Sequence, residues 1–155
     1  MTIRLSDQTP HYQGKKRLVV SEEKKKKHRA INASENDVRQ YRIDGDVITG
    51  KQKRCDYLLL NDTKRNAYFI ELKGSSIDQA CKQLLSVWDI FEGCPDLKEY
   101  VFLFRIVYSG SPSPSIIGSS ERKLKQRTAK TKPLKVDGRK VKLYRKESAL
   151  LEEYI

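Results

Sequence analysis

The chain contains two short apolar segments that carry charged residues: Cys55-Asp56-Tyr57-Leu58-Leu59-Leu60 and Ala67-Tyr68-Phe69-Ile70-Glu71-Leu72-Lys73-Gly74. They are aromatic and aliphatic, and the polar residues 61–66 separate them, which predicts two adjacent strands joined by a turn. Alternation along a strand places Phe69, Glu71 and Lys73 on one face. A neighbouring strand could place Asp56 beside them. Two carboxylates and an ammonium would then converge at one end of a sheet.

This set of side chains suits metal-assisted hydrolysis of phosphodiesters. Two nearby carboxylates repel each other, which disfavours ionisation of both unless a cation lies between them. Mg²⁺ fits because it takes oxygen ligands, keeps several waters and is commonly held by one or two carboxylates plus phosphate oxygens. Lys73 could hold the attacked phosphate or help to activate water. The structural alternative is a simple ion pair between Asp56 and Lys73, since 34% of the residues are charged and most charges are solvated.

The pattern resembles that of the PD-(D/E)XK nuclease superfamily, whose restriction-endonuclease-like fold occurs in restriction enzymes, Holliday-junction resolvases and repair exonucleases. The resemblance covers roughly residues 20–108. It makes Asp56 the first acid, Glu71 the second, fifteen positions later, and Lys73 the lysine. Cys55 stands where the family usually has a proline, which is a common departure.

The resemblance also implies a cofactor and its ligands. Asp56, Glu71 and the carbonyl of Leu72 would hold Mg²⁺, with Mn²⁺ as the alternative ion. A glutamine on the following helix, Gln83 or Gln79, would position the site beside Lys73. The family also has an acid on its first helix, and the candidates for it are Glu22, Glu23 and Glu35, with Asp44 in reserve. Asp44 precedes a glycine, where an aspartate more often serves a turn.

Length and composition bound the architecture. With 155 residues, 37% of them hydrophobic, the chain is expected to form one domain with a substantial core. No apolar run approaches the roughly eighteen residues of a membrane span and the N-terminus lacks a signal-peptide core, which predicts a cytoplasmic protein without membrane contact. Three cysteines without metal-ligand spacing, Cys55, Cys81 and Cys94, predict reduced, partly buried thiols.

The net charge of +12 is concentrated near the C-terminus. Between Glu121 and Lys146 there are twelve Lys or Arg residues and two acids. Such clustering is typical of phosphate-backbone binding, and the alternatives are a solvated surface, an acidic partner or a membrane surface. The residues predicted to bind nucleic acid are Arg122, Lys123, Lys125, Arg127, Lys130 and Lys132. A second basic run, residues 24–29, is weaker evidence for such binding, and the alternative for it is an exposed helix or loop.

Periodicity and turn residues predict the order of the elements. An irregular arm (1–17) is followed by a catalytic core (18–108) with a helix at 21–31, strands at 38–48, 54–60 and 67–73, a helix at 76–92 and a central strand at 99–108. After a loop (109–120), the basic extension (121–155) is predicted to hold a hairpin at 134–144 and a short helix at 148–155. His11 and His28 are expected at the surface.

The predicted fold is therefore an α/β domain: a restriction-endonuclease-like mixed sheet flanked by helices, in the order helix, three strands, helix, strand, with a basic C-terminal hairpin. The predicted function is Mg²⁺-dependent phosphodiester hydrolysis, with DNA as the expected partner and a homodimer as one option for assembly. One alternative is a catalytically inactive nuclease-fold subunit that binds nucleic acid. Another is a basic interaction protein without a site. DNA or RNA, and endonuclease or exonuclease action, stay open.

Overall fold

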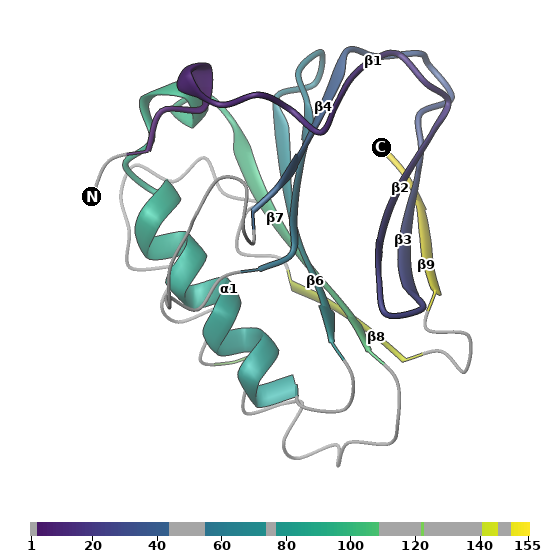
Figure 1. Ribbon diagram of the computed structural model, residues 1–155, viewed down its shortest axis with the longest axis vertical. Coiled ribbons are helices and arrows are strands. Elements are labelled where there is room, and N and C mark those ends of the chain that lie inside the picture. Colours follow the sequence, from purple (N-terminus) through teal and green to yellow (C-terminus); the bar gives the residue numbers. More distant parts are fainter. Residues whose placement is uncertain (1–2, 44–54, 74–76, 109–121, 123–140, 146–149) are drawn as a thin grey trace.

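The computed structural model describes residues 3–43, 55–73, 77–108, 122, 141–145 and 150–155, and these form two sheets and one long helix (Figure 1). The larger sheet has six strands in the order β1-β4-β5-β6-β7-β8, and the smaller has three in the order β2-β3-β9. The strands are β1 (Tyr12–Gly14), β2 (Leu18–Glu23), β3 (Lys26–Ile31), β4 (Val38–Arg42), β5 (Tyr57–Asn61), β6 (Asn66–Lys73), β7 (Val101–Tyr108), β8 (Val141–Arg145) and β9 (Leu150–Tyr154). The helices are α1 (Ile77–Phe91) and the 3₁₀ turns η1 (Leu5–Asp7) and η2 (Pro95–Leu97).

The centre of the larger sheet is a meander followed by a crossover. β4, β5 and β6 pair antiparallel, and β5 meets β6 with Tyr57 opposite Ile70. The chain then passes through α1 to β7, which pairs parallel with β6 so that Glu71 lies opposite Ile106. Parallel neighbours require such a crossover. It brings the ends of β6 and β7 and the start of α1 to the same edge of the sheet.

Two apolar layers cover the larger sheet. On one face, Trp88 and Phe91 of α1 are buried against Phe69 of β6 and Phe104 of β7, and the ring centroids of Phe69 and Phe91 are 5.6 Å apart. On the other face the smaller sheet packs through Val19 and other buried side chains: Ala30, Leu59, Ile70, Val107, Leu151 and Ile155. Burying a large apolar side chain contributes roughly 1.5–3 kcal/mol, so these two layers hold the sheets together. Trp88 and Phe91 are core residues, and β7 is covered on both faces, as the sequence predicted.

The helix predicted at residues 21–31 is wrong. Residues 18–31 form the β2–β3 hairpin, with Glu23 paired to Lys26 and a two-residue turn between them. Ser21 followed by two glutamates has the composition of a helix start, but the side chains alternate, with Val19 and Ser21 buried and their neighbours outside. The smaller sheet therefore lies on the face where the family resemblance implies a helix (Figure 1).

The predicted C-terminal helix at 148–155 is also wrong. Leu150–Tyr154 is strand β9, and it pairs parallel with β3. The first arm and turn of the hairpin predicted at 134–144 lie outside the described ranges, which resume at residue 141. Its second arm is strand β8, which pairs parallel with β7. The short-range pattern at 148–155 failed because β9 finds its partner, β3, far away in the sequence.

The arm at residues 1–17 is not wholly irregular, because it contains η1 and β1, and β1 pairs with β4. His28 is fully buried, not at the surface, whereas His11 is exposed. All three cysteines are buried, and none of them forms a disulfide. Within the described ranges, no helix is long and apolar enough to cross a membrane.

Candidate active site at the end of β5 and β6

Asp56 and Glu71 lie beside the first residue pair of the β5–β6 ladder, in which Tyr57 is paired with Ile70. Asp56 lies at a bend directly before β5, and its N–H donates to the carbonyl of Ile70 at 3.1 Å. Glu71 follows Ile70 in β6, so the two acids occupy neighbouring positions at the same end of the hairpin. The hairpin thus brings together the two acids that the sequence analysis selected.

Electrostatics place both carboxylates beside one thiol. Glu71 is only 2% exposed, and Cys55, directly before Asp56, is fully buried. Burial raises the pKa of the Cys55 thiol well above its ordinary value, and the negative charges of Glu71 and then Asp56 raise it further. A buried carboxylate close to a second one provides oxygen donors of the kind that a hard divalent cation takes.

The rest of the Glu-Leu-Lys triplet lies at the same edge. The backbone N–H of Leu72 donates to Oδ2 of Asp56 at 2.7 Å, which fixes the orientation of that carboxylate. The side chain of Leu72 is buried between the two sheets. Lys73 is the last residue of β6, and its backbone pairs with Tyr108 at the end of β7.

Of the two candidate glutamines, the structure favours Gln83. Gln79 is exposed, whereas Gln83 is half-buried and its Oε1 is buried without a hydrogen-bond partner among the described residues. Gln83 lies six residues into α1, about 9 Å along the axis at 1.5 Å per residue. The helix α1 packs on β6, the strand that carries Glu71. A buried amide oxygen on that helix can take part in a polar site.

None of the described candidates for the third acid approaches Asp56. Glu22 and Glu23 lie in β2, on the far side of the larger sheet from α1. Glu35 precedes β4 at the other end of the meander, where Arg17 lies 3.5 Å from it. Asp44 falls outside the described ranges. Within these ranges, no three His, Cys, Asp or Glu side chains are grouped to hold a metal ion.

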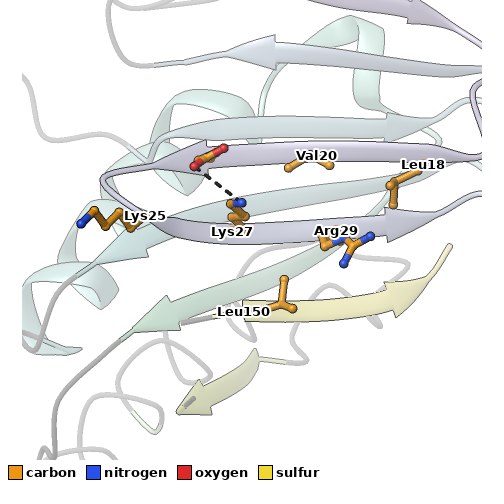
Figure 2. A pocket seen from close by; sticks show the side chains of 7 residues that line it. Leu18, Val20, Lys25, Lys27, Arg29 and Leu150 are labelled. Carbon is orange, nitrogen blue, oxygen red and sulfur yellow. Dashed lines mark ion pairs between the residues drawn. The ribbon is translucent and has the colours of Figure 1, made fainter. Parts of the chain in front are cut away.

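The predicted nucleic-acid-binding set lies mostly outside the described ranges. Arg122 is exposed, and the others lie outside these ranges: Lys123, Lys125, Arg127, Lys130 and Lys132. The second basic run, residues 24–29, forms the β2–β3 turn and the start of β3, and Lys25, Lys27 and Arg29 line a hollow on the smaller sheet (Figure 2). The signal in the sequence that predicts strand β2 is the period-two pattern of residues 18–23. The resemblance of Ser21 to a helix cap obscured this pattern.

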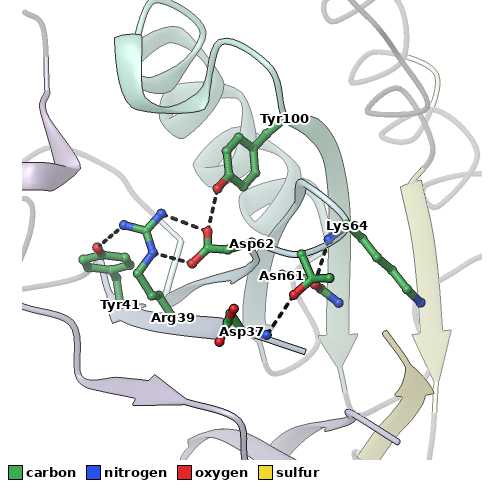
Figure 3. A network of polar contacts seen from close by, with 8 residues as sticks. Asp37, Arg39, Tyr41, Asn61, Asp62, Lys64 and Tyr100 are labelled. Carbon is green, nitrogen blue, oxygen red and sulfur yellow. Dashed lines mark hydrogen bonds and ion pairs between the residues drawn. The ribbon is translucent and has the colours of Figure 1, made fainter. Parts of the chain in front are cut away.

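A separate polar cluster lies at the other end of the meander (Figure 3). Arg39 donates to both oxygens of Asp62, from Nε at 2.7 Å and from Nη2 at 2.9 Å, and the Tyr100 hydroxyl donates to Asp62 Oδ1 at 2.5 Å. The hydrogen bond with Asp62 raises the pKa of the Arg39 guanidinium, so the pair is held fully charged. Its groups satisfy one another, which is the arrangement of a structural clamp.

The sequence matches no family model, and neither a curated protein nor a solved structure matches it significantly. The geometry around Asp56 and Glu71 is therefore the basis for inferring what the protein does. That geometry consists of two acids at the same end of the β5–β6 hairpin, one of them fixed by a backbone amide, and a half-buried glutamine on the helix that packs on β6.

Proposed function

We propose that the protein is a Mg²⁺-dependent nuclease, with Mn²⁺ as an alternative ion. The observation that carries the proposal is the end of the β5–β6 hairpin, where Asp56 bonds to Ile70 and Leu72, the two neighbours of Glu71 in β6. Like charges on neighbouring strands destabilise a sheet, which supports a function for these two acids. A divalent cation between the carboxylates would remove the repulsion.

Each residue has a defined part in the proposed reaction. Asp56 and Glu71 supply the carboxylate ligands, and the carbonyl of Leu72 is a further candidate ligand. The bound cation would polarise the scissile phosphate and lower the pKa of a coordinated water. Lys73 would bind the attacked phosphate and stabilise its developing charge, and Gln83 would orient the site through its buried Oε1. The N–H of Leu72 keeps Asp56 in place before the cation binds.

The order of elements supports a restriction-endonuclease-like fold. Three antiparallel strands (β4, β5, β6), a crossover helix (α1) and a parallel strand (β7) follow one another as the PD-(D/E)XK resemblance implies. The departure is the β2–β3 hairpin, which occupies the place of the first helix and removes Glu22 and Glu23 from contention as ligands. DNA is the proposed substrate, because the basic segment that includes Arg122 suits a phosphate backbone.

The alternative is a nuclease-fold subunit that binds nucleic acid without cutting it. One observation favours it: no group of three metal ligands occurs within the described ranges. Two carboxylates alone can hold Mg²⁺ when phosphate oxygens and water complete the shell, so the nuclease remains the first proposal.

A cleavage assay separates the two. Wild type is incubated with supercoiled, linear and single-stranded DNA and with RNA, in Mg²⁺, Mn²⁺ or EDTA. We expect metal-dependent products, lost almost completely in Asp56→Ala, Glu71→Ala and Lys73→Ala, because residues that act as one unit fail together. The double variant Asp56→Ala/Glu71→Ala should be hardly worse than either single variant. Glu92→Ala, at an exposed position just after α1, is the matched control and should cut like wild type.

Metal-independent cleavage, or activity that survives in all three site variants, would contradict the proposed mechanism. Binding of nucleic acid by wild type, without cleavage in either metal, would establish the alternative function instead.

A further inference from the structure

The outward face of the smaller sheet forms an ordered array of side chains, which we call the outer basic face. The pairing places Glu22, Lys27 and Leu150 in one row across the three strands, and Val20, Arg29 and Glu152 in the next. The third row consists of Leu18, Ile31 and Tyr154. Alternate residues of β2, β3 and β9 point inward to the core, so these nine point away from it.

This face combines apolar side chains with cations, two of which are paired with acids. Leu18 and Val20 are each 39% exposed, and Tyr154 is 75% exposed. Lys27 lies 3.9 Å from Glu22, and Arg29 lies 3.3 Å from Glu152. The hollow on this face, about 490 Å³, is lined by Leu18, Val20, Glu22, Lys25, Lys27, Arg29 and Leu150 (Figure 2). Exposed apolar side chains beside cations suit a ligand that has flat apolar groups and negative charges.

The turn at the end of this face puts lysines where the backbone disfavours them. Lys24 and Lys25 connect β2 to β3 with φ of 46° and 68°. Positive φ at both central residues is the signature of a type I′ turn, for which Asn-Gly is the preferred sequence. The register sets Glu23 opposite Lys26 and Glu22 opposite Lys27, so the two turn lysines lie beyond the paired acids. A strained turn that also concentrates like charges indicates a role outside folding.

The turn lies at the same end of the molecule as the candidate active site. The hydroxyl of Tyr57, the residue after Asp56, donates to the backbone carbonyl of Glu22 at 3.0 Å. Figure 1 shows the β2–β3 turn and the end of β6 at the same lower end of the two packed sheets. Packed sheets are about 10 Å apart. A bound nucleic-acid strand that extends from Asp56 and Glu71 would therefore meet the turn lysines before it reaches the outer basic face.

We propose that the outer basic face binds single-stranded nucleic acid, with phosphates on Lys24, Lys25, Lys27 and Arg29 and bases over the apolar residues. The inference rests on the proposed function only in taking nucleic acid as the ligand. A duplex keeps its bases stacked inside and has nothing to offer Leu18 and Val20, whereas a single strand presents bases that pack on apolar and aromatic side chains. Tyr154 is placed by the register to stack at the far end of the face.

The first test replaces the turn by its preferred sequence, Lys24→Asn/Lys25→Gly. Because this relieves positive φ and charge repulsion, the melting temperature should rise by a few degrees. Affinity for a single-stranded oligonucleotide of roughly 16 nucleotides, at the upper end of site sizes for one such module, should nevertheless fall. Greater stability together with weaker binding excludes misfolding as the cause of the loss.

The second test counts phosphate contacts. The variant Lys24→Gln/Lys25→Gln/Lys27→Gln should reduce the slope of log K against log salt by roughly 0.7 per lost contact, about 2 in all. The matched control has the same charge change at the other end of the molecule, where three lysines are exposed: Lys15→Gln/Lys64→Gln/Lys98→Gln. Leu18→Ser/Val20→Ser should weaken single-strand binding and leave the salt slope unchanged, because it removes apolar contacts and no charge.

The outcomes of these two tests distinguish binding of single strands at this face from the alternatives. The inference would be overturned if the turn variants kept wild-type affinity, or if they lost as much affinity for a matched duplex. It would also be overturned if this face bound anionic vesicles or an acidic peptide in place of the oligonucleotide. An oligonucleotide that binds through this face but is never cut in Mg²⁺ would overturn the proposed function and leave the inference standing. Metal-dependent cleavage by wild type, together with wild-type affinity in the turn variants, would overturn this inference and leave the proposed function standing.

Discussion

Strand β5 has an aspartate at each end, and the two have different neighbours. Asp62, directly after β5, receives two hydrogen bonds from Arg39 and one from Tyr100 (Figure 3). Asp56, directly before β5, receives a hydrogen bond from the N–H of Leu72, next to the buried Glu71. The same hairpin therefore carries an acid held by a guanidinium at one end and two neighbouring acids at the other.

The difference separates acids that hold the fold from acids that serve a site. A carboxylate that is partly buried is stable when a bidentate guanidinium satisfies it, as at Asp62. Two neighbouring carboxylates repel each other, and a cation between them removes the repulsion. We therefore expect Asp62 to stabilise the fold, and Asp56 with Glu71 to serve the candidate site.

The largest effect is expected at a second compensated acid, Glu153 of β9. His28 Nε2 lies 2.7 Å from its Oε2, and Arg105 Nε donates to the same oxygen at 2.8 Å. Burial would raise the pKa of Glu153, but these hydrogen bonds and the charges behind them lower it to about 2, from an ordinary value of 4.5. A depressed folded-state pKa gives stability that is present above pH 4.5 and lost as the pH falls toward 2, up to about 3 kcal/mol.

The measurement is the free energy of unfolding between pH 7 and pH 2, for wild type and for Glu153→Gln. Wild type should lose stability more steeply below pH 4.5, and the two curves should converge at the acid end. If the two curves of unfolding free energy against pH stayed parallel over the whole range, the charge of Glu153 would not be stabilised by His28 and Arg105.

A smaller loss is expected from breaking the clamp at Asp62. Arg39→Gln leaves the carboxylate without its charged partner, and the side chains involved are only 21% and 24% exposed. We expect a destabilisation of about 2 kcal/mol, with cleavage activity per folded molecule unchanged. Urea unfolding together with the nuclease assay would measure both. A loss of activity in stable protein would place the clamp within the functional machinery and remove the contrast between the two ends of β5.

The sequence predicted the part of the larger sheet that carries the candidate site better than it predicted the smaller sheet. β6, α1 and β7 have long, unbroken apolar patterns, and a local hairpin brings Asp56 and Glu71 to the same end of the sheet, so nearby residues determine both. The β2–β3 hairpin depends instead on β9, which comes from the end of the chain. His28 is buried only because Glu153 arrives there to pair with it. No periodicity in residues 21–31 carries that information, and the local glutamates favoured a helix.

The smallest effect is the one most specific to the candidate site. Glu71→Gln keeps the shape of the side chain and removes one of the two facing charges, so without metal the protein should be more stable by up to about 1 kcal/mol. Adding Mg²⁺ should raise the melting temperature of wild type, since a ligand that binds only the folded state stabilises it, and should leave Glu71→Gln unchanged. Asp62→Asn is the matched control at the other end of β5: it should lower stability and keep the response to Mg²⁺. Destabilisation by Glu71→Gln in EDTA would show that Glu71 already has its charge compensated within the fold, and Asp56 and Glu71 would then belong with Asp62 as structural acids.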